Sequence, residues 1–380
     1  MRGWRWIASL ALLLGSAGAC GGGAEEDAEG PLKVGVLVDL SGQTRSYGQA
    51  TVNGIRMAAE EIGAAGGPAV ELVIEDDGGV PDRARAAAEK LLAAGVHVLI
   101  GSTNSGTTLA AAPAAEAAKI PIVTPTATNP EVTKIGEHVF RICFVDSFQG
   151  EVMANFAHAS LRARRAALLV DRDSPYSRGL AQFFEGEFLK FGGETVAEET
   201  YAENDEDFTA QLAAVKAAQP DVLFVPGYYA QAGLIAKQAR AAGIAIPLLG
   251  GDGWDAPEIW QIGGDALNRS FISSHFSSQA PGAAVEKFVA DYKTRHDGQA
   301  PDAFAALGYD AMKLVAAARE RAKGTSPAKL RNAIARTFNF PGVTGEITIN
   351  RERNALKDAV VIELVDGQSV YRATMSPLLM

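Results

Sequence analysis

The chain has little of what a metal or redox site requires. Its 380 residues include only two cysteines, Cys20 and Cys143, and no Cys-x-x-Cys pair, so the usual zinc-finger and dithiol motifs are excluded. The histidines lack metal-ligand spacing, and each is interpreted as a surface or helix-end residue: His97, His138, His158, His275 and His296. We therefore expect no metal and no cofactor.

Catalytic signatures and basic patches are also missing. The chain has no Gly-x-Gly-x-x-Gly turn after its first apolar segment, no phosphate-binding loop, no Gly-x-Ser-x-Gly elbow and no His–acid pairing. Lys and Arg number 35 against 45 Asp and Glu, a formal net charge of −10, with no block of positive residues. The sequence thus argues against an enzyme, and against nucleic acid or an anionic membrane surface as a partner.

The first 20 residues have the layout of an export signal. Arg2 and Arg5 precede a short apolar segment at 7–14, and small residues fill 15–19 before Cys20. The apolar segment is too short to cross a bilayer, so residues 1–20 are interpreted as a signal peptide. A cysteine at this place resembles the lipobox of bacterial lipoproteins, in which cleavage precedes the cysteine and its thiol carries lipid.

A plain signal peptide with a chance cysteine is the alternative, since Ala17 stands where a lipobox usually has Leu. The Gly-rich, acidic segment 21–31 cannot form a core and suits a flexible tether. If Cys20 carries lipid, Cys143 has no partner for an intramolecular disulfide. The expected location is therefore periplasmic or at the cell surface, anchored to a membrane through Cys20.

From residue 32 onward, short β-branched segments alternate with Ala-rich helical ones. Strands are expected at 33–40, 70–75, 96–100 and 120–124, and helices at 54–62, 83–94 and 108–118. The order then repeats, with strands at 166–170, near 198–201, at 221–225 and at 246–249, and helices at 179–191, 208–218 and 231–242. This alternation predicts an α/β fold with two doubly wound, parallel-sheet domains of like topology.

The loops that follow these strands are rich in Ser, Thr, Tyr and Gly. In doubly wound sheets a ligand lies beyond the carboxyl ends of the strands, so two facing domains would present six such loops to one cleft. Ordinary turns use the same residue types, so turn formation alone explains the composition of any single loop. It does not explain the same composition in six loops at matched positions. Further helices are expected at 283–295, 304–321 and 327–336, followed by strands with turns at 350–354 and 366–367.

Six segments carry a resemblance to a known family. SGQTRSYG, LIGSTNSGTT, TPTATNPE, SPYSRGLA, PGYYAQAG and GGDGW stand in the order and spacing of periplasmic leucine/isoleucine/valine-binding proteins. The chain resembles this family from about residue 32 to 371. The resemblance implies the two-domain type I binding-protein fold, joined by a multi-strand hinge. It also implies an amino acid, branched-chain or related, captured in the cleft and delivered to the permease and ATPase subunits of an ABC transporter.

The resemblance also implies ligand-binding roles. Ser105 and Thr128 would bind the ligand carboxylate, and the backbone carbonyl of Thr126 and the side chain of Asp252 would bind its ammonium. Asn104, where the chain departs from the family, would instead donate a hydrogen bond into the cleft. Aromatic residues would enclose the ligand: Tyr47, Tyr176, Tyr228 and Phe304. From the residues alone, Ser105 is equally a helix cap, Asp252 a solvated turn residue, and Tyr47 and Phe304 core residues.

The chain departs from the family pattern at three places. The usual pair of cysteines is absent, with Gly79 and Asn104 near those positions, and Trp254 adds bulk or a stacking face beside Asp252. The expected domains are 32–146 with 275–359, and 147–274 with 360–380. A monomer is expected. Two alternatives remain open: a sensor of the same fold that signals to a membrane receptor, and a binder of an amide or aromatic carboxylate.

Overall fold

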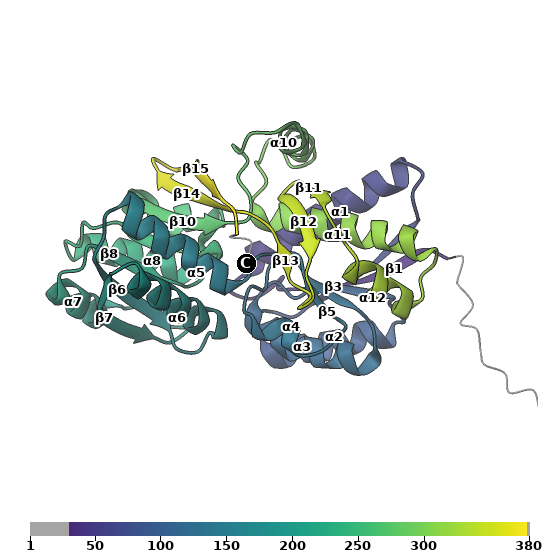
Figure 1. Cartoon of the computed structure of the whole chain (residues 1–380), viewed down its shortest axis with the longest axis horizontal. Helices are drawn as coiled ribbons and strands as arrows, with labels where there is room; N and C mark the ends of the chain where they lie inside the picture. Colours follow the sequence, from purple (N-terminus) through teal and green to yellow (C-terminus); the bar gives the residue numbers. More distant parts are fainter. Residues whose placement is uncertain (1–29, 378–380) are drawn as a thin grey trace, which may run out of the picture.

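A computed structural model describes residues 30–377, which form two lobes side by side (Figure 1). The first lobe is built on a five-stranded parallel sheet of order β2-β1-β3-β4-β5. Its strands are β1 (Leu32–Val38), β2 (Val70–Asp76), β3 (Val98–Gly101), β4 (Ile122–Thr124) and β5 (Val139–Arg141). The β-branched residues of β1 and β3 are buried on both faces, as parallel strands covered by helices require.

Helices from both halves of the chain cover this sheet. They are α1 (Arg45–Ala64), α2 (Pro81–Ala93), α3 (Ser105–Ala118), α4 (Glu131–Lys134), α11 (Ala303–Ala322) and α12 (Pro327–Ala335). Glycines let α1 and α11 cross closely, because a Cβ on Gly54 would lie 1.9 Å from the carbonyl oxygen of Ala305. The late helix α11 thereby returns to the first lobe and carries Phe304 with it.

The second lobe contains a seven-stranded sheet of order β15-β14-β10-β9-β8-β6-β7. Five strands are parallel: β6 (Arg165–Asp171), β7 (Glu194–Tyr201), β8 (Val222–Val225), β9 (Leu248–Gly250) and β10 (Ser270–Ser274). The last two, β14 (Ala359–Val365) and β15 (Gln368–Met375), add an antiparallel edge. The sheet is therefore mixed, whereas the alternation of segments predicted a parallel one.

The remaining elements surround the second sheet and the junction of the lobes. They are α5 (Asp146–Asn155) with a π-helical turn (Phe156–Ser160), α6 (Pro175–Lys190), α7 (Thr209–Ala218), α8 (Tyr229–Ala241), two 3-10 turns (Asp252–Trp254 and Gly264–Leu267), α9 (Glu258–Gly263) and α10 (Ala283–Arg295). A small antiparallel sheet joins β11 (Phe340–Gly342), β12 (Gly345–Ile349) and β13 (Ala355–Leu356).

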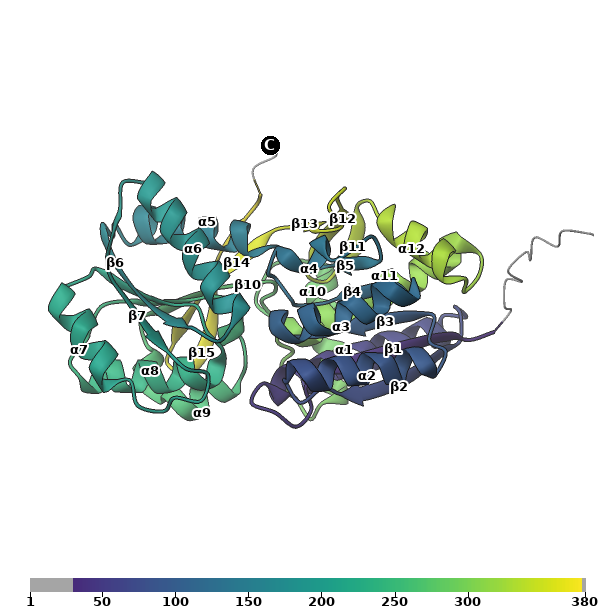
Figure 2. The same cartoon turned by 90° about the horizontal axis from the view of Figure 1, so that it is seen from below.

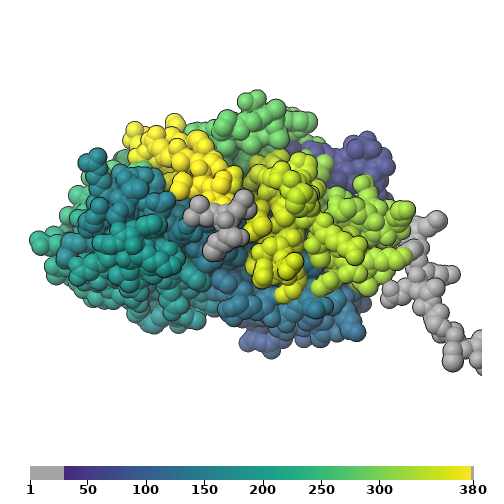
Figure 3. All heavy atoms as spheres, viewed as in Figure 1, coloured from purple at the N-terminus to yellow at the C-terminus, as the bar shows by residue number. Residues whose placement is uncertain are grey.

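Three segments connect the lobes. Residues 142–145 lead from β5 to α5, residues 275–282 follow β10, and residues 357–358 lead from β13 to β14. Figure 2 shows the last crossing, and in the space-filling view of Figure 3 the C-terminal strands, in yellow, lie on the surface of both lobes. The predicted fold, two doubly wound domains joined by a multi-strand hinge, is confirmed.

Candidate functional site

One buried cavity lies at the carboxyl ends of the strands, where the lobes face each other. It has a volume of about 10 Å³, roughly the space that one water molecule needs. Its lining contains all nine side chains that the sequence analysis assigned to a ligand: Tyr47, Asn104, Ser105, Thr126, Thr128, Tyr176, Tyr228, Asp252 and Phe304. Thr103 and Gly253 complete the lining. Residues up to 257 positions apart in sequence, Tyr47 and Phe304, therefore meet at one place, out of reach of any local motif.

The first-lobe side of the cavity is lined by hydroxyl groups at a helix start. Ser105 is the first residue of α3, and Thr128 lies in the loop after β4. The Oγ1 atoms of Thr103 and Thr128 are buried and have no hydrogen-bond partner of standard geometry among residues 30–377, although the Thr128 hydroxyl also acts on the carboxyl group of Asp146. A helix N-terminus with free hydroxyl groups is suited to an anion.

Asn104 uses its donor differently from the sequence-based expectation, and the side chain of Thr126 supports a neighbouring loop. Nδ2 of Asn104 donates to Oγ1 of Thr44 at 2.7 Å, so its donor stays within the lobe and Oδ1 is the atom without a partner. Oγ1 of Thr126 donates to the carbonyl oxygen of Thr103 at 2.6 Å. Thr126 thus fixes the loop that carries Ser105.

The second-lobe side of the cavity carries a negative charge. Oδ1 of Asp252 accepts hydrogen bonds from Nε2 of Gln149 at 2.7 Å and from the hydroxyl of Tyr176 at 2.8 Å. Oδ2 of Asp252 lies 3.1 Å from Nε2 of His275. Asp252 is only 5% exposed, so this carboxylate is held away from bulk water and faces the cavity.

A second carboxyl group is buried behind Asp252. Both oxygens of Asp146, at the start of α5, lack a hydrogen-bond partner among the described residues. Burial, followed by the negative charge of Asp252, raises the pKa of Asp146 to about 8. Asp146 therefore holds its proton near neutral pH, and the carboxylate that makes this side of the cavity favourable for a cation is that of Asp252.

Aromatic rings form the walls between the two polar ends. Tyr47 stacks on Phe304 with ring centroids 3.9 Å apart, and Tyr176 stacks on Tyr228 at 5.4 Å. Tyr47 also meets Tyr228 edge to face at 6.0 Å, across the junction of the lobes. The cavity therefore combines an anion-binding end, a cation-binding end and apolar walls.

Hydrogen bonds between the lobes hold the cavity closed. The hydroxyl of Tyr47 donates to the carbonyl oxygen of Gly253 and accepts from the backbone N–H of Tyr229 at 3.2 Å. At the rim, the hydroxyl of Tyr229 donates to the carbonyl oxygen of Gln43 at 2.6 Å, and Nε2 of Gln231 donates to Oε1 of Gln43 at 2.9 Å. The structure is thus a closed form of the two lobes.

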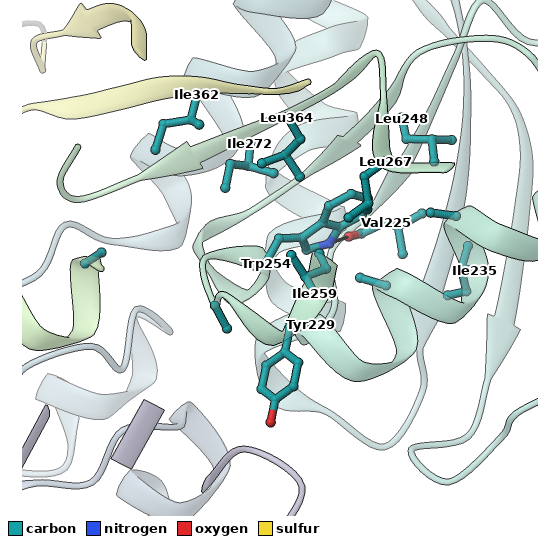
Figure 4. Close-up of a cluster of buried hydrophobic side chains, with 14 of the residues drawn as sticks. Val225, Tyr229, Ile235, Leu248, Trp254, Ile259, Leu267, Ile272, Ile362 and Leu364 are labelled. Carbon is teal, nitrogen blue, oxygen red and sulfur yellow. Dashed lines mark hydrogen bonds between the residues drawn. The ribbon is translucent and has the colours of Figure 1, made fainter. Parts of the chain in front are cut away.

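The position of Trp254 corrects a sequence-based expectation. Its side chain is fully buried in the core of the second lobe, among the aliphatic residues drawn in Figure 4, and does not line the cavity. Its indole Nε1 donates to the carbonyl oxygen of Val225 at 2.9 Å. Trp254 therefore fixes the turn that begins at Asp252 instead of offering a face to a ligand.

Two of the residues that form hydrogen bonds with Asp252 were not predicted from the sequence. His275 was interpreted as a surface or helix-end residue, yet it is only 3% exposed and directly follows β10. Gln149 belongs to α5, a helix that the analysis did not expect. A buried strand that ends in Ser-Ser and is followed directly by His was the one available signal for His275, since a histidine there lies at the carboxyl end of the strand.

Cysteine and metal chemistry are not supported in the described part of the chain. Cys143 is a free, buried thiol, and burial raises its pKa to about 12. Within residues 30–377, no group of three or more His, Cys, Asp or Glu side chains is placed to hold a metal ion. Cys20 lies outside the described residues.

No helix within residues 30–377 has the length and hydropathy needed to cross a membrane.

A family profile and a curated relative agree on the family to which the chain belongs. The sequence profile of the periplasmic binding protein family matches residues 31–368. A Leu/Ile/Val-binding protein homologue of Brucella melitensis is 30% identical over 322 residues, 83% of this chain and 86% of that protein. The resemblance found in the six sequence segments is thereby confirmed.

Solved structures agree in fold. A leucine-binding protein of Thermotoga maritima has a TM-score of 0.88 and 37% identity, covering 91% of this chain and 99% of that one. A branched-chain amino acid transporter substrate-binding protein of Streptococcus pneumoniae, in complex with isoleucine, has a TM-score of 0.86 and 33% identity, covering 91% and 100%.

Proposed function

Because the chain belongs to the periplasmic binding protein family, we propose that it captures a branched-chain or related amino acid between its lobes and delivers it to an ABC transporter. The observation that carries this proposal is an interlobe cavity with an anion-binding end, a carboxylate end and aromatic walls. These three features match the carboxylate, ammonium and side chain of an apolar amino acid.

We assign a role to each part of the cavity. Ser105, Thr128 and the start of α3 bind the ligand carboxylate, and Asp252 with the backbone carbonyl of Thr126 binds the ammonium. Asn104 contributes its free Oδ1 acceptor beside them. The aromatic residues enclose the ligand side chain: Tyr47, Tyr176, Tyr228 and Phe304. Burying both charges of a zwitterion requires a partner for each, because an unpaired buried charge costs several kcal/mol.

Ligand binding then requires a change of shape. A cavity of about 10 Å³ is too small for an amino acid, so the lobes must open for entry and the aromatic walls must separate to admit the ligand. The closed form is favoured once a ligand bridges both lobes, which is the way a ligand shifts such an equilibrium. Closure around the three crossing segments would give the permease a surface that differs between free and loaded protein.

We propose the domain limits 32–146 with 275–359, and 147–274 with 360–380. Pairing of β14 with β10, and of β15 with β14, supports the assignment of the C-terminal strands to the second lobe. The packing of α11 on α1 supports the return of residues after 275 to the first lobe. Capture, and not catalysis, is the proposed activity, and the chain acts as a monomer.

For location, we propose export through residues 1–20 and a lipid anchor on Cys20, with residues 21–31 as the tether. The order of positive, apolar and small residues before Cys20 supports this. Expression in a bacterial host with a labelled fatty acid tests it: the wild-type chain is expected to carry the label in the membrane fraction. Label on a Cys20→Ala variant would contradict the proposal.

A thermal-shift screen tests the capture function. The mature chain, residues 21–380, would be heated with each of the twenty amino acids and with a panel of amides and aromatic acids. A ligand at a hundred times its Kd stabilises the folded state by about 2.7 kcal/mol, so leucine, isoleucine or valine is expected to raise the Tm. A shift with amides or aromatic acids alone would remove the ammonium role of Asp252, and no shift at all would overturn the proposal.

A further inference from the structure

The three crossings between the lobes meet beside Asp252. His275 begins the second crossing, and its ring stacks on Phe144 of the first crossing with centroids 3.7 Å apart. The charge of Lys357, in the third crossing, acts on the imidazole electrostatically. His275 does not line the cavity, so any role toward a ligand must pass through the residue that it contacts, which is Asp252.

The hydrogen bonds of Asp252 leave one acceptor site free. A carboxylate offers about four lone-pair sites, two on each oxygen. Gln149 and Tyr176 both donate to Oδ1, and the single contact of Oδ2 is with His275. The remaining site for a ligand N–H is therefore on Oδ2, the oxygen that the imidazole contacts. Since an ionised carboxylate only accepts hydrogen bonds, Nε2 of His275 must carry the hydrogen.

We propose that His275 is a positioning residue that, through its Nε2–H, orients Oδ2 of Asp252 toward the ammonium of the ligand. The proposal rests on the capture function proposed above. Its Nδ1 is buried without a hydrogen-bond partner among the described residues, which fits a neutral ring that carries its single hydrogen on Nε2. A protonated ring would place an unpartnered N–H in the core and a positive charge against Asp252, in competition with the ligand ammonium.

The surroundings of the ring favour this neutral form. Burial lowers the pKa of His275 and the charge of Lys357 lowers it further, while the hydrogen bond and the charge of Asp252 oppose the shift. Other titratable groups lie on the elements packed nearby. Asp146 begins α5 and Cys143 lies in the first crossing, and Asp255 accepts a hydrogen bond from Ser274. Because the pKa of Asp146 is about 8 and that of Cys143 about 12, neither changes charge markedly between pH 5 and 7. Burial raises the pKa of Asp255 to about 6, so Asp255 does titrate within this range.

The test compares two ligands that differ only in the ammonium group, L-leucine and 4-methylpentanoate, by calorimetry on the mature chain. His275→Ala is expected to weaken leucine binding at least tenfold, which corresponds to about 1.4 kcal/mol, and to leave the Kd of 4-methylpentanoate within about twofold. His275→Gln, which keeps an N–H donor near Nε2, should restore most of the leucine affinity. His296→Gln, at the end of α10, is the matched control and should bind both ligands as the wild type does.

A pH series gives a second readout that a packing role would not move. The Kd of the wild type for leucine should rise as the pH is lowered from neutral, because a proton on His275 competes with the ligand. His275→Gln should show a smaller rise, since it retains Asp255 but has no imidazole to protonate. Equal losses for both ligands in His275→Ala, or an unchanged pH dependence in His275→Gln, would overturn the positioning role alone. Failure of the wild type to bind leucine or any other amino acid would instead overturn the capture function and this inference with it.

Discussion

The ring of Tyr47 stacks on the ring of Phe304, with centroids 3.9 Å apart and planes 4° from parallel. Both rings belong to the first lobe, on α1 and α11, yet the hydroxyl of Tyr47 bonds with the backbone of Gly253 and Tyr229 in the second. One side chain therefore forms part of the apolar wall and also joins the lobes. The two roles reside in different atoms and are separable by mutation.

Tyr47→Phe keeps the stacked ring and removes the bonds between the lobes. Each of the two hydrogen bonds contributes about 1 kcal/mol to the closed form. We therefore expect leucine to dissociate up to about thirtyfold faster, with little change in its association rate. Stopped-flow measurements on the mature chain give both rates. Tyr371→Phe, on the edge strand β15, is the control, and equal dissociation rates in wild type and Tyr47→Phe would show that Tyr47 does not hold the lobes together.

Asp252→Ala tests the ammonium site directly. The variant leaves the ligand ammonium buried without its partner. We therefore expect leucine binding to fall below detection, and not merely a small loss of affinity. Calorimetry at up to millimolar ligand measures this, with the exposed Asp265→Ala in the same lobe as control. Near-wild-type affinity in Asp252→Ala would contradict the assignment of the site.

The order of strands and helices was predictable from the sequence, because the periodic apolar residues of a doubly wound fold are the ones that its strands and helices bury. α10 begins at Ala283 and ends at Arg295, as the pattern predicted. α1 was predicted to begin near residue 54, but begins at Arg45. Its first turns are rich in Ser, Thr and Gly, which locally favour a loop, and packing against α11 overrides that preference.

Cavity-lining loops were predictable as well, since they follow strands whose carboxyl ends share one edge. The residues that pack behind these loops and support them were not predictable. α5 carries Asp146 and Gln149, but its apolar residues show little helical periodicity because both of its faces are partly buried. The stack of His275 on Phe144 joins residues 131 positions apart, and no local pattern encodes such a contact.

Asp146 is expected to make the folded protein less stable as pH rises. Its pKa is about 8 in the folded state, whereas an unfolded aspartate titrates near 3.9. Between these values the folded state holds a proton that the unfolded state releases, so this contribution to stability is complete below about pH 4 and declines up to about pH 8. Asp146→Asn cannot ionise and should escape the decline.

Urea unfolding at pH 5 and pH 8 measures the effect. At pH 8 Asp146→Asn should exceed the wild type in free energy of unfolding by on the order of 2 kcal/mol, with a smaller advantage at pH 5. Asp265→Asn, an exposed aspartate, should follow the wild type at both values. A difference independent of pH would indicate altered packing, because a titration effect must change with proton activity.

Cys143 offers a direct measurement of lobe opening, since it is the single cysteine of the chain from residue 21 onward and lies in the first crossing. The thiol is fully buried and donates to the carbonyl oxygen of Ala127 at 3.4 Å. With a pKa of about 12, only about one ten-thousandth of it is ionised at pH 8, and the thiolate is the reactive form. Labelling by a disulfide reagent should therefore be slow in the native protein and complete in urea.

A saturating concentration of leucine should slow the native labelling further, because a ligand that bridges the lobes reduces the population in which the crossing segments are exposed. Tyr47→Phe should label faster than the wild type without ligand, since it lacks the bonds that close the lobes. Labelling that is as fast in the native state as in urea would show that the first crossing is open to solvent. If leucine does not slow the labelling, exposure of the first crossing is not coupled to lobe closure. The hinge motion of the lobes would then have to occur at the other two crossings.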